Sequence, residues 1–445
     1  MEKINRSRCC VVGWMLVGAL FSLTCGAGTE STSVPNVVLI SLDTLSADHL
    51  GLYGYAQDTS PVLDRFADGA VVFGRAIAQS NSTLSSHRSL FQSKYPSVAL
   101  RDSTMLAEIL AEAGYRTAGF TGGGNVAATF GFGRGFEVYE EHDGGLKESL
   151  PQVQRWLDEV AGAPFFLFLH TYEIHLPYDA PAPFDKMFYP EYDGKVTGAN
   201  SREILRRVRG LDESEKTKPQ DPLTAADRRK IVALYDGGIR SVDQQLAGLF
   251  ADLEKRKLLD DSLVIVLSDH GEEFWDHGSV IHSHTLFQEL VRVPLLMRFP
   301  AGAHGGTRVL STAMLLDVSP TILDIVGLPV SPSFTGRSML PAIRGSDSSH
   351  RKVLSEGEMM RSWINYPWKL IVSPRERSSK LFNLEDDPAE RQNLHRARPE
   401  RVKAMNEELG AAVSTKSDLS RVKELEDGDI DEELKERLRA LGYID

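Results

Sequence analysis

Cysteine is nearly absent from this chain of 445 residues. Its three cysteines, Cys9, Cys10 and Cys25, all stand close to the N-terminus. The remaining sequence therefore offers no thiol for a disulfide framework, a cysteine nucleophile or a thiolate metal site. A chain of this length can be stable without disulfides because it buries a large core.

An excess of basic residues is also missing. The 50 Lys and Arg residues against 62 Asp and Glu residues give a formal net charge of −12. Proteins that bind nucleic acid normally present a basic face, so this balance argues against a nucleic-acid partner. The content of 42% hydrophobic and 25% charged residues is that of an ordinary globular protein. The length suggests one large domain and a smaller one.

Long hydrophobic runs are missing too, except near the N-terminus. There, Lys3, Arg6 and Arg8 precede an apolar stretch at 9–23, and small residues follow at 25–28. This is the layout of a secretory signal peptide, which we assign to residues 1–27. We therefore expect export to the periplasm or the extracellular space.

Two alternatives remain for this leader. A membrane anchor is the first, but the apolar stretch is somewhat short because a bilayer span takes about 20 residues. A lipoprotein leader is the second. In that case Cys25 would carry the lipid, although Ser22 and Thr24 make a poor lipobox. A lipid anchor is then the one membrane contact that we expect.

Apolar runs alternate with helical patterns from Val34 onward. The runs VVLISL at 37–42, FFLFLH at 165–170 and SLVIVLS at 262–268 have the composition of strands buried on both faces. Amphipathic stretches, such as 228–253, stand between them. This alternation predicts an α/β fold with a mostly parallel central sheet flanked by helices.

Charged residues directly follow two of these runs. Asp43 follows the first, and Asp269 and His270 follow the third. The carboxyl ends of parallel strands open into one crevice, so residues just past separate strands can converge there. Two carboxylates and an imidazole suit a divalent cation, and we predict a metal site. The alternative is that each Asp only caps a helix.

Composition shifts divide the chain further. We assign residues 34–345 to a catalytic domain and 346–445 to a small antiparallel subdomain with a charge-rich helical tail from Ser417. Residues 179–229 read as a loop-rich insertion. It either covers the mouth of the crevice, where specificity often resides, or is a solvated connector.

Several motifs occur in the order found in the sulfatase family, and the chain resembles that family over nearly its whole length after the leader. The motifs are VLISLDTLSADHLGLYG (38–54), SNSTLSSHRSLFQSKYPS (80–97), FGFGRGFEVYE (130–140), FLHTYEIHLPY (168–178), SDHGEEFWDHG (268–278), ELVRVPLL (289–296), DVSPTILDIVGLP (317–329) and LFNLEDDPAERQNL (381–394). The resemblance implies the fold of the alkaline phosphatase superfamily, whose members cleave sulfate esters, phosphate esters or phosphonates. Fold alone does not choose between them.

One departure from the family concerns the nucleophile. Sulfatases carry Cys or Ser in a C/S-x-P-S-R motif and oxidise that residue to formylglycine. Here TLSSH places Thr83 at the nucleophile position, Ser85 at the Pro and His87 at the Arg. A threonine has a β-methyl group, so we expect no formylglycine. Its hydroxyl can act as a nucleophile if a cation activates it.

The resemblance also implies a ligand set. We predict a first metal site of Asp43, Asp269, His270 and the Thr83 oxygen. Thr44 stands where many sulfatases have a second Asp, and His270 stands where calcium-dependent members have Asn. The imidazole favours zinc or manganese, with calcium as an alternative.

Three further histidines fall in family motifs. His175 matches the HxPY motif and is predicted to protonate the leaving group, for which its ordinary pKa near 6.5 is suitable. His282 and His284 stand where the family places a residue that neutralises the anionic oxygens, and spacing does not choose between them. The alternative for His175 is a loop cap.

Other candidates are weaker. His87 is predicted to neighbour the nucleophile, although an imidazole lacks the forked donors of Arg. Asn125, after three glycines, either faces the substrate or only forms a turn. A second metal site of Glu173, His175 and His282 is an alternative. His170 and His277 read as supporting residues, as do Arg134 and Asp317.

These observations predict an exported, metal-dependent hydrolase of a sulfate or phosphate-type ester, with an anionic ester as its substrate. The resemblance favours sulfuric esters, whereas Thr83 favours a phosphodiesterase, a phosphonate ester hydrolase or a phosphotransferase. The absence of further membrane spans disfavours the transferase. A non-catalytic binding protein with this fold is the remaining alternative. The sequence identifies no protein partner.

Overall fold

A computed structural model describes residues 34–160, 162–211, 221–373 and 376–414, together with Glu432, Lys435, Glu436 and Leu438. Its centre is an eight-stranded sheet with the order β12-β2-β11-β7-β1-β6-β4-β5. The strands are β1 Asn36–Leu42, β2 Val71–Phe73, β4 Arg116–Thr121, β5 Val138–Glu141, β6 Phe165–Thr171, β7 Ser262–Leu267, β11 Leu295–Arg298 and β12 Arg308–Val309.

The middle of this sheet is parallel, as the buried apolar runs predict. β1 pairs in parallel with both β6 and β7, and β4 pairs in parallel with β5 and β6. Strand β11 runs antiparallel to its neighbours β2 and β7. The predicted α/β fold with a mostly parallel sheet is confirmed.

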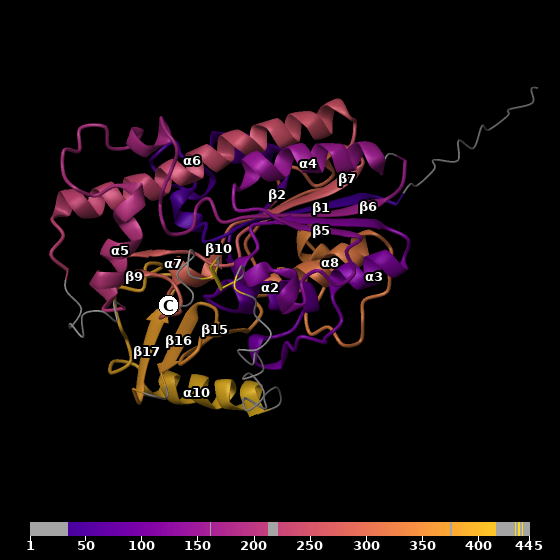
Figure 1. Cartoon of the computed structure of the whole chain (residues 1–445). Helices are drawn as coiled ribbons and strands as arrows, with labels where there is room; N and C mark the ends of the chain where they lie inside the picture. Colours follow the sequence, from indigo (N-terminus) through magenta and orange to yellow (C-terminus); the bar gives the residue numbers. More distant parts are fainter. Residues whose placement is uncertain are drawn as a thin grey trace, which may run out of the picture. The chain divides into compact units, whose positions relative to one another are not determined.

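Helices cover both faces of the sheet (Figure 1). α1, α4 and α6 pack on one face, and α2, α3 and α8 pack on the other. The helices are α1 Pro61–Asp68, α2 Thr83–Gln92, α3 Leu106–Glu112, α4 Leu146–Glu159, α5 Gly198–Arg209, α6 Ala225–Lys255, α7 Gln288–Val291, α8 Val318–Ile325, α9 Leu340–Ile343 and α10 Pro399–Ser414.

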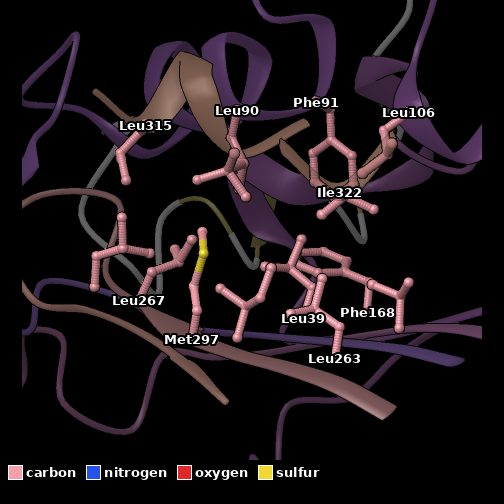
Figure 2. Close-up of a cluster of buried hydrophobic side chains, with 14 of the residues drawn as sticks. Leu39, Leu90, Phe91, Leu106, Phe168, Leu263, Leu267, Met297, Leu315 and Ile322 are labelled. Carbon is pink, nitrogen blue, oxygen red and sulfur yellow. The ribbon is translucent and has the colours of Figure 1, made fainter. Parts of the chain in front are cut away.

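The alternation of side chains along β1 divides the core into two clusters. Leu39 belongs to the cluster beneath α2, α3 and α8, whereas Ile40 belongs to the cluster beneath α4 and α6. In Figure 2, Leu39 and Phe168 of the sheet face Leu90 and Phe91 of α2. Helix α2, which begins with Thr83, is therefore fixed against the sheet by buried apolar side chains, and each large one stabilises the fold by about 1.5–3 kcal/mol.

Three smaller sheets complete the architecture. β3 Ala76–Ile77, β10 Arg292–Val293 and β13 Ala313–Met314 form one sheet, and β8 Glu273–Phe274 pairs with β9 Val280–Ile281. The third is an antiparallel sheet of β14 Val353–Glu356, β15 Arg361–Asn365, β16 Trp368–Ser373 and β17 Ser378–Asn383. An antiparallel sheet near the C-terminus was expected, although β15 was not recognised in the sequence.

The C-terminal sheet is tied to the segment that leads into α2. The Glu356 amide donates to the Gln79 carbonyl at 2.8 Å, and the Ser80 hydroxyl donates to the Glu356 carbonyl at 2.9 Å. Helix α10 packs on the same sheet through Val402 and Met405. The two hydrogen bonds with Glu356 fix the chain just before Thr83.

The expected insertion at 179–229 contains helix α5 and the start of α6. A capping box begins each of them, at Thr197 and Thr224. The predicted signal peptide, Cys25 and most of the tail from Ser417 lie outside the described residues. Within the described part of the chain, no helix is both long enough and apolar enough for a bilayer span.

Candidate active site

The strand register brings Asp43 and Asp269 to the same level at one edge of the sheet. Ser41 of β1 lies opposite Leu267 of β7, and each Asp follows two residues later. Both carboxylates are fully buried. The convergence expected at the carboxyl ends of parallel strands is therefore present.

His270 and Thr83 join the two carboxylates. Nε2 of His270 lies 3.3 Å from the Thr83 hydroxyl, and Nδ1 donates to the Gly271 carbonyl at 3.0 Å. The latter bond directs Nε2 into the site. Thr83 is the first residue of α2, where the helix dipole favours negative charge.

This arrangement fits a cation. Asp43, Asp269 and His270 each offer one ligand atom, and these atoms lie within 4.8 Å of one another. Oδ1 of Asp43 and Oδ2 of Asp269 are buried without a hydrogen-bond partner in the described part of the chain. Buried acceptors without partners are costly, and a cation would satisfy both. Carboxylate and imidazole donors suit zinc or manganese.

The pKa shifts of Asp43 and His270 also favour a bound cation. Burial and the charge of Asp269 raise the pKa of Asp43 well above its usual value. Burial lowers the pKa of His270, but the charges of Asp269 and Asp43 outweigh that effect and raise it overall. Both raised pKa values mean that Asp43 and His270 bind protons more readily when no cation is present. A cation and protons would therefore compete for the same side chains.

Two neighbours support Asp43. Nε2 of His170 donates to Asp43 Oδ2 at 3.1 Å, and Nδ1 of His170 accepts from the Gly122 amide at 3.4 Å. Burial lowers the pKa of His170 to about 4, which keeps the ring neutral with this tautomer. Tyr172 packs edge-on against His170 and accepts from the Asn125 amide at 3.1 Å. The Asn125 loop is thus anchored to the site through its backbone.

Thr44 occupies a strained position next to Asp43. Its φ of 58° lies in the left-handed region, which is unfavourable for a β-branched residue. Its amide donates to Asp269 Oδ1 at 3.3 Å, and its carbonyl accepts from Tyr235 at 2.7 Å. Backbone strain of this kind is found at functional sites. Thr44 therefore aligns Asp269 through its main chain.

His87 lies beneath the site with both ring nitrogens engaged inside the protein. Nδ1 donates to the Thr83 carbonyl at 2.9 Å and lies 3.6 Å from Asp269, and Nε2 lies 3.0 Å from the Ser41 hydroxyl. Burial lowers its pKa to about 4. A neutral, fully enclosed imidazole fits a residue that positions Thr83 rather than one that holds an oxyanion.

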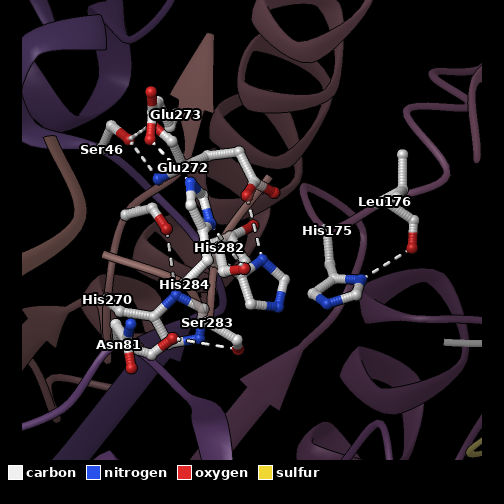
Figure 3. Close-up of polar contacts among 12 residues, drawn as sticks. Ser46, Asn81, His175, Leu176, His270, Glu272, Glu273, His282, Ser283 and His284 are labelled. Carbon is white, nitrogen blue, oxygen red and sulfur yellow. Dashed lines mark hydrogen bonds and ion pairs between the residues drawn. The ribbon is translucent and has the colours of Figure 1, made fainter. Parts of the chain in front are cut away.

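His175 and His282 face each other beside His270 (Figure 3). Their ring centroids are 4.9 Å apart, and the His282 ring is 4.6 Å from that of His270. Nδ1 of His175 donates to the Leu176 carbonyl at 2.7 Å, and Nδ1 of His282 lies 2.9 Å from Glu272 Oε1. Each ring is therefore oriented through Nδ1.

Burial and its neighbour His282 lower the pKa of His175 to about 3. The ring is therefore neutral at neutral pH in the substrate-free protein. A bound anionic ester would favour its protonated form, since a nearby negative charge raises the pKa of an imidazole.

The structure separates His282 from His284. Nδ1 of His284 donates to the His282 carbonyl at 3.1 Å, and Nε2 lies 2.8 Å from Glu273 Oε2. Both nitrogens of His284 are therefore engaged by other protein groups. Arg209 of α5 also donates to the His282 carbonyl, at 2.9 Å. His282 is thus the member of this pair whose ring contacts the candidate metal ligand His270.

Glu173, His175 and His282, the residues of the alternative second metal site, do not form a group of converging ligand atoms among the described residues. Glu173 accepts from the Leu146 amide at 2.8 Å, from the Thr171 hydroxyl at 3.0 Å and from Gln245 at 2.8 Å. Its carboxylate therefore caps α4 and is not a partner of His282. The carboxylate beside His282 is that of Glu272.

A cavity of about 420 Å³ opens beside His175. Tyr172, Leu176 and Pro177 line it together with Arg202 of α5 and the carboxylates of Glu173 and Asp179. Helix α5 of the insertion thus borders the cavity through Arg202 and contacts the His282 loop through Arg209. This placement favours the first of the two expectations for the insertion, a segment that borders the crevice.

The profile of the sulfatase family matches residues 35–328, which is more than half of the chain. The chain belongs to the sulfatase family. A second profile, N-sulphoglucosamine sulphohydrolase, C-terminal, matches residues 276–416. The protein is thus an ester hydrolase of a metal-dependent family, and the family expected from the motifs is confirmed.

Relatives of this sulfatase-family chain are distant. It is 21% identical over 416 residues to the Delta 4,5-hexuronate-2-O-sulfatase of Bacteroides thetaiotaomicron, a match that covers 83% of this chain and 86% of that protein. It is 30% identical over 210 residues to arylsulfatase K of Mus musculus, covering 43% of this chain and 37% of that protein. The match thus spans less than half of arylsulfatase K.

The fold is shared with a solved member of the superfamily. The phosphonate monoester hydrolase of Agrobacterium radiobacter superposes with a TM-score of 0.69 and 21% identity, covering 85% of this chain and 95% of that chain. An identity this low supports the likeness of fold alone.

Three contributors to this sulfatase-family site were missed in the sequence. Glu272 orients His282, Tyr172 anchors the Asn125 loop, and Ser41 contacts His87. Glu272 stands in the same SDHGEEF stretch as Asp269 and His270, so a role near the site could have been predicted from its position in the sequence. The contacts of Tyr172 and Ser41 depend on side-chain packing between strands, which spacing alone does not reveal.

Proposed function

We propose that this protein is an exported, metal-dependent sulfatase-family hydrolase that cleaves a sulfate or phosphate-type ester with the Thr83 hydroxyl. One observation carries the proposal. The Thr83 hydroxyl lies 3.3 Å from Nε2 of His270, beside two buried carboxylate oxygens that have no hydrogen-bond partner in the described part of the chain. A hydroxyl at that place is positioned to attack a group bound at the same centre.

Asp43, Asp269 and His270 would hold the cation. A divalent cation supplies two effects there: it lowers the pKa of a neighbouring hydroxyl, and it neutralises the charge of a bound ester. The start of α2 adds its dipole to the same end, which favours an anionic group near Thr83. His87 and Ser41 hold the first turn of this helix in place.

The chemical step follows from these positions. Thr83 loses its proton to solvent, and its oxygen forms a bond to the sulfur or phosphorus of the ester while the bond to the leaving oxygen breaks. His175, protonated when the anionic ester binds, gives the proton on Nε2 to the leaving oxygen. Water then attacks the covalent Thr83 ester, returns a proton to His175, and releases sulfate or phosphate with the threonine oxygen restored.

His282 and the neighbouring cavity complete the substrate site. His282 lies beside the metal ligands, where its ring can contact the anionic oxygens of the ester. The cavity beside His175 is placed for the alcohol part of the substrate. Its lining by Arg202, Glu173 and Asp179 offers both charged donors and acceptors to the polar groups of that part.

The proposal allows two kinds of substrate, a sulfate ester and a phosphate-type ester. The sulfate form rests on the family and on the name of the hexuronate sulfatase relative. The phosphate-type form rests on Thr83, because one hydroxyl cannot expel sulfate as a formylglycine hydrate does. Parallel assays with 4-nitrophenyl sulfate, a phosphate monoester, a phosphodiester and a phosphonate ester test the choice. Preference for sulfate with an unmodified Thr83 would contradict the chemical argument.

A non-catalytic binding protein is the second candidate. The enclosed position of His87 and the loss of an acid at Thr44 favour it. The intact grouping of Asp43, Asp269 and His270 with His175 and His282 favours the enzyme. Turnover of any of the four esters above the rate of a Thr83→Ala variant decides for the enzyme.

Export remains part of the proposal on sequence grounds. The basic residues, apolar stretch and small residues at 1–28 support a cleaved leader. Labelling with a radioactive fatty acid tests whether Cys25 carries a lipid. Absence of label from the protein would end the lipoprotein alternative and leave the secretory leader.

A further inference from the structure

A second cavity, of about 290 Å³, lies between the small β3, β10 and β13 sheet and the C-terminal sheet. Arg75, Arg292 and Arg308 line it together with Gln288, Ile364 and Tyr366. None of its lining residues belongs to the metal centre, and none is an Asp or Glu. It is thus a separate and positively charged site in a chain whose formal net charge is −12.

The three guanidinium groups have no carboxylate partner within the described ranges. Arg75 donates to the Leu310 carbonyl at 2.5 Å and to the Tyr366 hydroxyl at 2.8 Å. Arg292 donates through Nε to the Gly74 carbonyl at 3.2 Å, and Arg308 donates to the Leu52 carbonyl at 3.0 Å. Neutral acceptors position these side chains but do not compensate their charge.

The contacts also direct the donors of the arginines. The Arg75 guanidinium stacks 4.3 Å from the centre of the Tyr366 ring, which fixes its plane. The Arg292 guanidinium lies 5.4 Å from the centre of the Tyr53 ring and donates through Nε, so its terminal amino groups have no hydrogen-bond acceptor among the described residues. A guanidinium in this state presents the forked donors that match a sulfate, phosphate or carboxylate.

Gln288 provides an independent observation. Its side-chain Nε2 is buried and has no hydrogen-bond partner in the part of the chain that the structure describes. Its main-chain amide donates to Glu390 Oε2 at 2.6 Å, which fixes the start of α7 beside the cavity. An unsatisfied buried donor costs about 1–3 kcal/mol, and a bound oxygen acceptor would remove that cost.

We propose that this cavity is a binding site for an oxyanion of the sulfate or phosphate type. Three like charges around one cavity repel each other, and an anion among them relieves the repulsion while accepting from the guanidinium forks and from Gln288. The apolar wall at Ile364 and the Tyr366 ring give room for an organic group attached to the anion. Two sources share this chemistry: a free inorganic ion, such as a product of ester hydrolysis, and an anionic group carried on a larger molecule.

The site does not depend on the chemistry proposed for Thr83. Calorimetric titration of the full-length protein with inorganic phosphate, inorganic sulfate and glucose 6-sulfate tests it at constant ionic strength. We expect saturable binding of at least one probe, with about a tenfold or greater loss of affinity in Arg292→Gln and Arg308→Gln. Gln288→Ala provides a second variant that leaves all charges in place, and its affinity should also fall.

Matched controls separate this cavity from the metal centre. Arg344→Gln removes an exposed arginine outside the cavity and should bind as the parent protein does. Thr83→Ala should also keep the binding, so failure of the proposed nucleophile and failure of this site give different results. Binding of inorganic ions identifies a free anion as the ligand, and binding of glucose 6-sulfate alone identifies a pendant group.

Two results would overturn the proposal. One is the absence of saturable binding for all three probes. The other is binding that persists in folded Arg292→Gln, Arg308→Gln and Gln288→Ala proteins but disappears in Thr83→Ala or after chelation, which would place the anion at the metal centre.

Discussion

Nε2 of His270 lies 3.3 Å from the hydroxyl of Thr83, although 187 positions separate the two residues in the sequence. One follows the end of β7 and the other begins α2, and both elements are fixed by buried apolar side chains. The contact therefore needs no rearrangement of the fold. It places the proposed nucleophile against the proposed metal ligand before any substrate arrives.

Replacement of the nucleophile is the first prediction. Thr83→Ala removes the attacking oxygen, so we expect kcat to fall by at least about 10³-fold with the preferred ester. Thr83→Ser retains a hydroxyl and should stay within about tenfold of the parent. Ser85→Ala, two residues later in the same helix, serves as the control and should have normal kcat. Parent-like turnover of Thr83→Ala would refute the nucleophile.

An intact-mass measurement belongs to the same prediction. We expect Thr83 to carry no oxidation, because its β-methyl group prevents conversion to the aldehyde. A mass change located on the peptide that contains Thr83 would mean that another covalent chemistry operates.

Metal dependence is the second prediction. Dialysis against a strong chelator should abolish turnover, and zinc or manganese should restore it. Because the cation binds the folded protein, adding it at about 100 times its Kd should raise the free energy of unfolding by about 2.7 kcal/mol. Asp43→Asn should lose most of this stabilisation. Metal analysis should give one equivalent per chain, and full activity in chelator would contradict the site.

The orientation of His282 is the third prediction. Glu272 Oε1 lies 2.9 Å from Nδ1 of His282, and burial raises the pKa of Glu272 to about 7. Glu272→Gln replaces the carboxylate beside Nδ1 of His282 by an amide of the same size. We expect kcat/KM to fall by about 10–100-fold, as for other residues that orient a functional histidine. Glu273→Gln, which contacts His284 instead, should have a smaller effect. Equal losses in the two variants would mean that the whole loop, and not His282, was disturbed.

The sequence predicted the frame of this site better than its details. Apolar runs that end in Asp43 and Asp269 sufficed to expect two parallel strands with converging carboxylates, because strand polarity alone decides that geometry. The left-handed conformation of Thr44 was not predictable, since no local signal favours positive φ at a β-branched residue.

The side-chain directions of the histidines were also not predictable from the sequence. The spacing of His282 and His284 did not separate them, because both follow the short strand β9 in a tight turn and their directions depend on Glu272 and Glu273. His87 was expected beside the nucleophile, and it is, but its pairing with Ser41 depends on packing between α2 and β1. Such contacts between distant elements carry no periodicity in the sequence.

The fourth prediction concerns stability and pH, and it rests on His49 and Asp236. Nδ1 of His49 lies 2.7 Å from Asp236 Oδ1, and Tyr55 donates to the other oxygen at 2.8 Å. Burial lowers the pKa of His49, but the hydrogen bond and charge of Asp236 outweigh burial and raise it overall. The folded protein therefore holds this proton at pH values where the unfolded chain has released it.

The sign of the pH effect follows from this raised pKa. The stability that His49 contributes is fully present below its unfolded pKa of about 6.5 and is lost as pH rises through the higher pKa of the folded state. Asp236→Asn should be about 1–3 kcal/mol less stable than the parent at pH of about 6, because it removes a hydrogen bond to a charged group. The difference should shrink as pH is raised toward about 9, since the parent loses its advantage as pH passes through the raised pKa of His49.

Urea denaturation at the two pH values measures both free energies of unfolding. Asp252→Asn is the matched control, since Asp252 lies on the same helix α6 but pairs with Arg256, whose charge does not change in this range. Its difference from the parent should stay constant. If Asp236→Asn is destabilised equally at both pH values, His49 is not the group that titrates, and the pair contributes through packing and neutral hydrogen bonds alone.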